Sequence, residues 1–144
     1  MSQEFQPIEN LSKGDKILLK HASRVRKRAY APYSKFLVGA VLVDEKGKIH
    51  TGCNVENASF TAGICAERAA IAKLVSRGAK QIKRVLVVTS SDEPALPCGV
   101  CLQAINEFGR NARVVAVNKR ASKFCEYPMS ALFPYSFNPE DVLR

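Results

Sequence analysis

A chain of 144 residues with 47% apolar side chains is long enough to bury a hydrophobic core, and we expect one domain over residues 1–144. No apolar run reaches the roughly 18 residues that span a bilayer, and the polar start at residues 1–10 lacks the basic-then-apolar pattern of a secretory signal. We therefore expect a cytoplasmic protein without membrane association. The net charge of +9 raises the question of a polyanionic partner.

The hydrophobic pattern predicts helices and strands that alternate along the chain. Apolar residues at three- and four-residue spacing predict a helix over 11–29, which Pro32 ends. The later elements are expected as strands at 36–43 and 48–55, a helix at 63–76, a strand at 84–89, a helix at 99–108, strands at 113–117 and 119–127, and a helical turn at 130–132. This alternation indicates an α/β fold in which helices sandwich a sheet.

The first predicted helix and the segment after it concentrate positive charge. Residues 13–35 hold eight Lys or Arg against a single acidic residue, Asp15. The ordinary interpretation is a solvated helix face, and the alternative is a patch that binds nucleic acid or another polyanion. Such patches usually add aromatic stacking residues, but the nearby Tyr30 and Tyr33 lie in a turn-like segment. Nucleic-acid binding is therefore a secondary hypothesis.

Three of the five cysteines, Cys65, Cys98 and Cys101, stand in two short motifs: Cys-Ala-Glu-Arg at 65–68 and Pro-Cys-Gly-Val-Cys at 97–101. An odd number of thiols cannot pair completely within one chain, and clustered thiols in a reducing compartment are typical metal ligands. Three thiols hold zinc and leave the fourth tetrahedral position for water, which is the composition of a catalytic site.

Each motif begins a predicted helix directly after a loop, where free backbone N–H groups and the helix dipole stabilise thiolates. Cys98 and Cys101 lie on the same side of one first turn, and Cys65 would complete the triad from the other helix. A redox Cys-x-x-Cys pair and a closed structural zinc site with Cys53 as fourth ligand are the alternatives. Otherwise we expect Cys53 and Cys125 to be free thiols, at least partly buried.

Neither of the two histidines is spaced like a metal ligand. We expect His21 at the edge of the core and His50, at the end of a hairpin strand, to be exposed. Glu67 lies two residues past Cys65, where a carboxylate can move protons without binding the metal, although the helix dipole alone would also favour it there. Together these residues indicate hydrolytic chemistry at zinc.

Three longer segments accompany the cysteine motifs: Tyr-Ala-Pro-Tyr-Ser-Lys-Phe-Leu-Val-Gly-Ala at 30–40, Gly-Cys-Asn-Val-Glu-Asn-Ala-Ser-Phe at 52–60 and Leu-Phe-Pro-Tyr-Ser-Phe-Asn-Pro-Glu-Asp at 132–141. From about Ala29 to the C-terminus the chain closely resembles the small, homotetrameric, zinc-dependent cytidine deaminases of the three-cysteine type. The resemblance implies a three-layer α-β-α sandwich with a mixed five-stranded sheet and one zinc ion per chain.

The reaction implied by this resemblance is the hydrolysis of cytidine or 2′-deoxycytidine to uridine or 2′-deoxyuridine plus ammonia, in pyrimidine salvage. Cys65, Cys98 and Cys101 would hold the metal, and zinc-bound hydroxide would be the nucleophile. Glu67 would be the catalytic proton shuttle. Arg68 would hydrogen-bond the ligand thiolates from outside the metal's ligand shell.

The resemblance also implies which residues contact the nucleoside. Asn54 and Glu56 would grip the ribose from one side of an extended segment. Phe36 would pack on the pyrimidine, although taken alone it is expected in the core. The backbone of Ala66 would hydrogen-bond the base.

Two further aromatics, Phe60 and Phe137, would reach across subunit interfaces of a homotetramer, so that active sites are shared and monomers are inactive. The chain departs from the family at Leu102, where an Arg usually follows the second cysteine of Cys-x-x-Cys and adds a cation beside the thiolates. The alternatives are a zinc deaminase of another aminopyrimidine nucleoside or a blasticidin-like antibiotic, an enzyme acting on polynucleotide RNA through the basic helix, and a non-catalytic zinc-stabilised fold.

Overall fold

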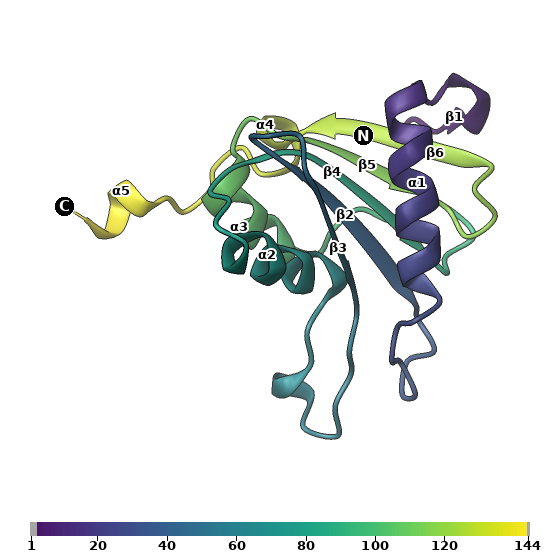
Figure 1. Cartoon of the computed structure of the whole chain (residues 1–144), viewed down its shortest axis with the longest axis horizontal. Helices are drawn as coiled ribbons and strands as arrows, with labels where there is room; N and C mark the ends of the chain where they lie inside the picture. Colours follow the sequence, from purple (N-terminus) through teal and green to yellow (C-terminus); the bar gives the residue numbers. More distant parts are fainter. Residues whose placement is uncertain (1–2, 144) are drawn as a thin grey trace.

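The computed structural model describes residues 3–143 and shows a six-stranded mixed sheet between layers of helices (Figure 1). The strand order is β1-β6-β5-β4-β2-β3, and every neighbouring pair is antiparallel except β4 with β5. The strands are β1 Gln6–Pro7, β2 Val38–Asp44, β3 Ile49–Cys53, β4 Ile82–Thr89, β5 Arg113–Val117 and β6 Lys123–Pro128. The ends of the expected 1–144 domain, residues 1–2 and 144, lie outside the described residues.

Helices cover both faces of the sheet: α1 lies on one face, and α2 and α3 lie side by side on the other (Figure 1). The helices are α1 Lys13–Arg26, α2 Ala66–Ser76, α3 Gly99–Gly109, α4 Met129–Leu132 and α5 Pro139–Val142, with 3₁₀ turns η1 at Ile8–Asn10 and η2 at Phe60–Ala62. The predicted three-layer α-β-α sandwich with a mixed sheet is confirmed. The predicted number of five strands is wrong, because the sheet has six.

The strand that the sequence did not reveal is β1, at the edge of the sheet. It pairs with β6 in antiparallel fashion, with Gln6 opposite Phe124 and Pro7 opposite Lys123. Proline is tolerated in a sheet only where its missing N–H costs nothing, as on an edge strand. Two exposed residues that include a proline carry no alternating pattern, so this strand forms only because β6 is there to pair with it.

Successive side chains of the central strands enter two different cores. In β2, Leu42 packs with Ala70 of α2 in one core, whereas Val41 packs with Leu18 and Ala22 of α1 in the other. Because the central strands are buried on both faces, they read in the sequence as nearly continuous apolar runs. The two cores fix α1 on one side of the sheet and α2 with α3 on the opposite side.

Two glycines allow the helices to lie directly against the sheet. A Cβ atom on Gly39 would be 2.1 Å from the carbonyl oxygen of Ala22 in α1. A Cβ atom on Gly52 would be 2.4 Å from the carbonyl oxygen of Ala66, the first residue of α2. Both neighbours are backbone atoms and cannot swing away, so these strand positions require glycine. Gly52 thereby sets how close the start of α2 comes to β3.

Two side chains lie differently from the sequence-based expectation. Phe36 precedes β2 and is 39% exposed, so it is not the buried first residue of a strand. His50 is only 2% exposed, because it faces the same side of the sheet as Leu42 and its Nε2 atom pairs with Asp44 Oδ2 at 2.7 Å. A paired histidine can be buried where an unpaired one would be costly.

The two leftover cysteines match their prediction as free thiols, with Cys53 partly buried and Cys125 buried. None of the helices within residues 3–143 has both the length and the apolar character needed to cross a membrane.

Candidate active site

Three thiols meet where α2 and α3 begin. The Sγ atoms of Cys65, Cys98 and Cys101 all lie within 4.8 Å of one another. Cys65 and Cys98 are the residues that cap the N-termini of α2 and α3, and Cys101 lies in the first turn of α3. The structure therefore brings the three predicted metal ligands together from two motifs that lie more than thirty positions apart in the sequence.

The charges around this cluster fit a bound cation. Burial, then the Glu67 carboxylate and the other two thiols, raise the pKa of Cys101, so three thiolates would not accumulate here without a compensating positive charge. Burial acts to raise the pKa of Cys98, but hydrogen bonds, first from the backbone and side chain of Cys101, together outweigh burial and lower this pKa. Soft thiolates in this number suit Zn²⁺, and they leave one tetrahedral position open.

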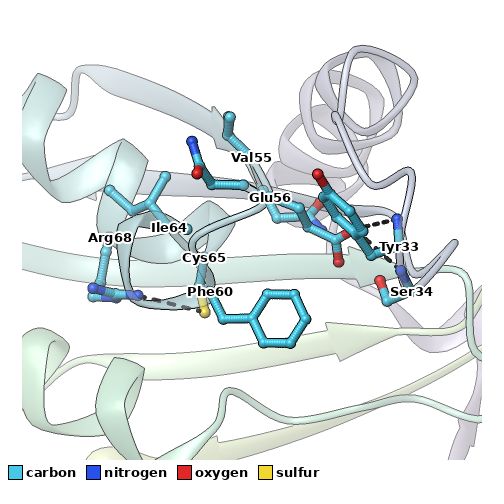
Figure 2. Close-up of a pocket in the computed structure, with 11 residues that line it drawn as sticks. Tyr33, Ser34, Val55, Glu56, Phe60, Ile64, Cys65 and Arg68 are labelled. Atoms are coloured by element: carbon cyan, nitrogen blue, oxygen red, sulfur yellow. Dashed lines mark hydrogen bonds between the residues drawn. The ribbon is translucent and has the colours of Figure 1, made fainter.

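Arg68 supplies positive charge beside the thiols. Its Nη2 atom donates to Cys65 Sγ at 4.0 Å (Figure 2), and this hydrogen bond is the main reason that the pKa of Arg68 is raised. Its Nε atom is buried and has no hydrogen-bond partner among the described residues. Leu102, at the position where the sequence lacks a second arginine, packs against the core beneath α2 and α3. Among residues 3–143, Arg68 is therefore the cation with a hydrogen bond to the thiol cluster.

Glu67, the second residue of α2, is a buried carboxyl group next to the cluster. It is 6% exposed, and Cys101 Sγ donates to its Oε2 atom at 3.5 Å. Burial raises the pKa of Glu67 above the usual value for a glutamate. A carboxyl group with a raised pKa can both accept and return a proton near neutral pH.

A hollow of about 530 Å³ opens beside Cys65 (Figure 2). Figure 2 shows Tyr33 and Ser34 at one end and Arg68 at the other, with Phe60 and Cys65 between them. The lining residues are Tyr33, Ser34, Asn54, Val55, Glu56, Asn57, Phe60, Gly63, Ile64, Cys65 and Arg68. Its volume lies in the range of small-molecule sites.

Glu56 is held rigidly in this hollow. Its Oε1 atom accepts hydrogen bonds from the backbone N–H groups of Tyr33 at 3.0 Å and Ser34 at 3.1 Å (Figure 2). Hydrogen bonding to Ser34, more than to Tyr33, holds the pKa of Glu56 below its usual value, so the group is a carboxylate at neutral pH. Sequence reasoning missed Tyr33 and Ser34 as supports, and the turn signal at Pro32 was the only local sign of their role.

Asn54 lines the same hollow, but its side-chain amide also hydrogen-bonds the backbone at the start of β2. Its Oδ1 atom accepts from Val38 N at 2.8 Å, and its Nδ2 atom donates to Phe36 O at 2.7 Å. One Nδ2 hydrogen is left for another partner.

Not every predicted contact residue lies in the hollow. The described residues that line it do not include Phe36 or Phe137, and Ala66 is fully buried. Phe60 is 81% exposed and meets Tyr33 edge-on, with ring centroids 6.1 Å apart.

Three cysteines from a Cys-x-Glu and a Pro-Cys-x-x-Cys motif, with the glutamate beside the thiols, match the signature of the zinc-dependent deaminases. Residues 12–118 match the family model described as the cytidine and deoxycytidylate deaminase zinc-binding region. The chain is 39% identical over 125 residues to a cytidine deaminase from Sporosarcina psychrophila, covering 87% of this chain and 92% of that protein. It is 42% identical over 123 residues to a probable cytidine deaminase from Dictyostelium discoideum, covering 85% and 82%.

Solved structures agree with the sequence relatives. The crystal structure of cytidine deaminase from Burkholderia pseudomallei superposes with a TM-score of 0.80 at 38% identity, covering 85% of this chain and 98% of that one. That of cytidine deaminase from Mycobacterium tuberculosis gives 0.75 at 30% identity, covering 88% and 98%. This chain belongs to the zinc-dependent cytidine deaminase family, and the predicted enzyme class and zinc cofactor are confirmed.

Proposed function

We propose that this enzyme hydrolyses cytidine and 2′-deoxycytidine to the corresponding uridines and ammonia, as a step of pyrimidine salvage in the cytoplasm. The observation that carries the proposal is the placement of a buried carboxyl group, Glu67, and three clustered thiols beside a hollow that holds a second, rigid carboxylate, Glu56. One carboxyl group serves proton transfer, and the other suits a sugar hydroxyl. The five free cysteines support a reducing compartment.

Cys65, Cys98 and Cys101 would hold zinc, one ion per chain. When bound, zinc acts as a Lewis acid that makes water nucleophilic at neutral pH. Arg68 offsets the negative charge of the thiolates through its contact with Cys65. The positive ends of α2 and α3 act in the same sense.

Glu67 would carry the protons of the reaction. Its carboxylate takes a proton from the attacking water, delivers it to N3 of the pyrimidine, and then passes the second water proton to the amino group that leaves as ammonia. Its burial beside the cluster favours this role, because burial raises the pKa of Glu67 and so makes the carboxylate a better proton acceptor.

The nucleoside would be held by groups that line or adjoin the hollow. Glu56 would accept from a ribose hydroxyl through Oε2, because the two backbone N–H groups both bind Oε1. Asn54 would add its remaining Nδ2 hydrogen. The backbone of Ala66 would hydrogen-bond the base, and Phe36, exposed at the entrance to β2, would pack on it.

We also propose that the chain forms one deaminase domain over 1–144 that assembles into a homotetramer with shared active sites. Phe60 and Phe137 are 81% and 59% exposed, so both aromatic side chains are available to pack against a neighbouring subunit. The segment that carries Phe137 and α5 extends away from the sheet (Figure 1). In the proposed tetramer a neighbouring subunit would cover the exposed side of this segment, which also contacts α3 of its own chain.

The proposal is tested by ultraviolet-monitored turnover of cytidine, 2′-deoxycytidine, cytosine and a short cytidine-containing RNA, measured side by side. We expect turnover of the two nucleosides without turnover of cytosine, because cytosine lacks the sugar hydroxyls that Glu56 and Asn54 would hydrogen-bond. Turnover of the RNA alone, or of a blasticidin-like antibiotic in place of cytidine, would overturn the assignment.

A further inference from the structure

We propose that the outward face of α1, together with η1, binds the phosphate backbone of single-stranded nucleic acid. This site is separate from the catalytic hollow and does not depend on the proposed reaction. Cys65 and Cys98 of the thiol cluster cap α2 and α3, which lie across the sheet from α1 (Figure 1).

Four cations form a row along α1 and its C-terminal end. Lys16, Lys20, Arg24 and Lys27 follow one another at spacings of four, four and three residues, and all four are exposed. Residues at this spacing lie on one side of a helix, with roughly 5–6 Å between successive Cβ atoms. The row is therefore about 16 Å long at 1.5 Å of rise per residue.

The row forms one wall of a groove. A hollow of about 700 Å³ lies beside it, with Ile8, Glu9 and Ala121 on the other side. Glu9 is the one carboxylate among the described residues that line the hollow. Lys16 Nζ donates to the backbone oxygen of Glu9 at 3.5 Å and does not pair with its carboxylate. Within residues 3–143, the four cations of the row form no ion pair, so their charge is available to a ligand.

Other cations of the same region have structural partners, which sets the row apart. Arg26 donates to Thr89 O at 2.6 Å, and Arg84 of β4 pairs with Asp15 on the buried face of α1. These contacts anchor the helix on the sheet. Among the described residues, the cations of the row form no such hydrogen bond or ion pair with the sheet, and Lys16 contacts only the backbone of Glu9.

The ligand chemistry follows from the spacing and surroundings of the row. Charges about 6 Å apart in a line suit a chain of phosphates, whereas a single small anion could contact only two of them. A membrane surface would require an apolar face for insertion, but Leu18 and Ala22 of α1 are buried against the sheet. No aromatic side chain lines the described groove, so the site would bind backbone phosphates without regard to base sequence.

The test measures binding of a fluorescein-labelled 12-nucleotide uridine oligomer by fluorescence anisotropy at 50–200 mM KCl. The oligomer contains no cytosine, so the catalytic reaction does not consume it. With four phosphate contacts, log K should fall against log salt with a slope of about −2.8, which means about sevenfold weaker binding for each doubling of salt. The double variant Lys20→Gln/Arg24→Gln should retain a slope of about −1.4.

The matched control is Lys80→Gln/Lys83→Gln, which removes the same net charge from two exposed residues outside the groove. Control and row variants should keep wild-type helix content and cytidine turnover, and Lys20→Arg/Arg24→Lys should restore binding if the first row variant folds poorly. An equal loss in the row and control variants overturns the proposal. So does undetectable binding by the wild type at 50 mM KCl, or binding to phosphatidylserine vesicles in place of the oligomer.

Discussion

Replacing Gly52 by alanine should disturb the active site by displacing the start of α2, without changing any residue proposed to contact substrate. The new Cβ atom would lie 2.4 Å from Ala66 O and 2.5 Å from Ala70 N, both in the backbone of α2. Real Cβ contacts rarely fall below 3.4 Å, so α2 must move by about 1 Å. Overpacking of this kind costs about 1–3 kcal/mol of stability.

The same movement displaces the catalytic groups, because α2 begins at Ala66 and carries Glu67 in its first turn. A misplacement of about 1 Å at a catalytic group lowers the rate by about 10²-fold. We therefore expect Gly52→Ala to lower both the urea midpoint of unfolding and kcat/KM for cytidine. Urea titration and an ultraviolet assay of the same sample measure the two effects.

The matched control is Gly14→Ala. Gly14 lies in α1, and an added Cβ atom there would meet nothing within 4 Å. Gly14 is the second residue of α1, and the preference of a helix for alanine over glycine, about 1 kcal/mol in the interior, is an upper bound there; this variant should be as stable as the wild type or slightly more so, and fully active. Wild-type stability and turnover in Gly52→Ala would refute the reasoning that β3 positions the start of α2.

Three further predictions concern charge, metal and assembly. The hydrogen bond with His50 is the main reason that the pKa of Asp44 is about 2 in the folded chain, compared with about 3.9 in the unfolded chain. The charged form of Asp44 therefore stabilises the fold, and this stabilisation is lost as the pH falls from about 4 to 2. In Asp44→Asn the urea midpoint of unfolding should depend less on pH between about 4 and 2. An unchanged pH dependence in this range would contradict the pairing of Asp44 with His50. Cys98→Ser should lower the zinc content found by metal analysis, and wild-type content would exclude it as a ligand. Phe60→Ala should reduce both the assembled mass in sedimentation and turnover, whereas a fully active monomer would rule out shared sites.

Much of the candidate site was predictable because its chemistry is local in the sequence. Cys98 and Cys101 are three residues apart at the start of one helix, and Cys65 and Glu67 are two apart at the start of another. Short-range spacing of this kind fixes which side chains share a helical turn. The sequence therefore predicted the thiol cluster and the neighbouring carboxyl group.

The parts that the sequence did not reveal depend on contacts between distant segments. The sixth strand, β1, pairs Gln6 with Phe124 across most of the chain. His50 is buried because Asp44 pairs with it, although its place in a hairpin suggested exposure. Glu56 is held by backbone N–H groups from another loop, which no side-chain pattern encodes. Tertiary pairing decides such positions over local propensity.

The most direct test of the central claim is turnover of cytidine by Glu67→Gln, measured together with zinc content. Gln keeps the shape of the side chain but cannot accept and return protons as a carboxylate does. The variant should bind about one zinc per chain, keep the wild-type fold by circular dichroism, and lose about 10²–10⁴-fold in kcat. Near-wild-type turnover by the zinc-loaded variant would contradict the assignment of Glu67 as the proton carrier.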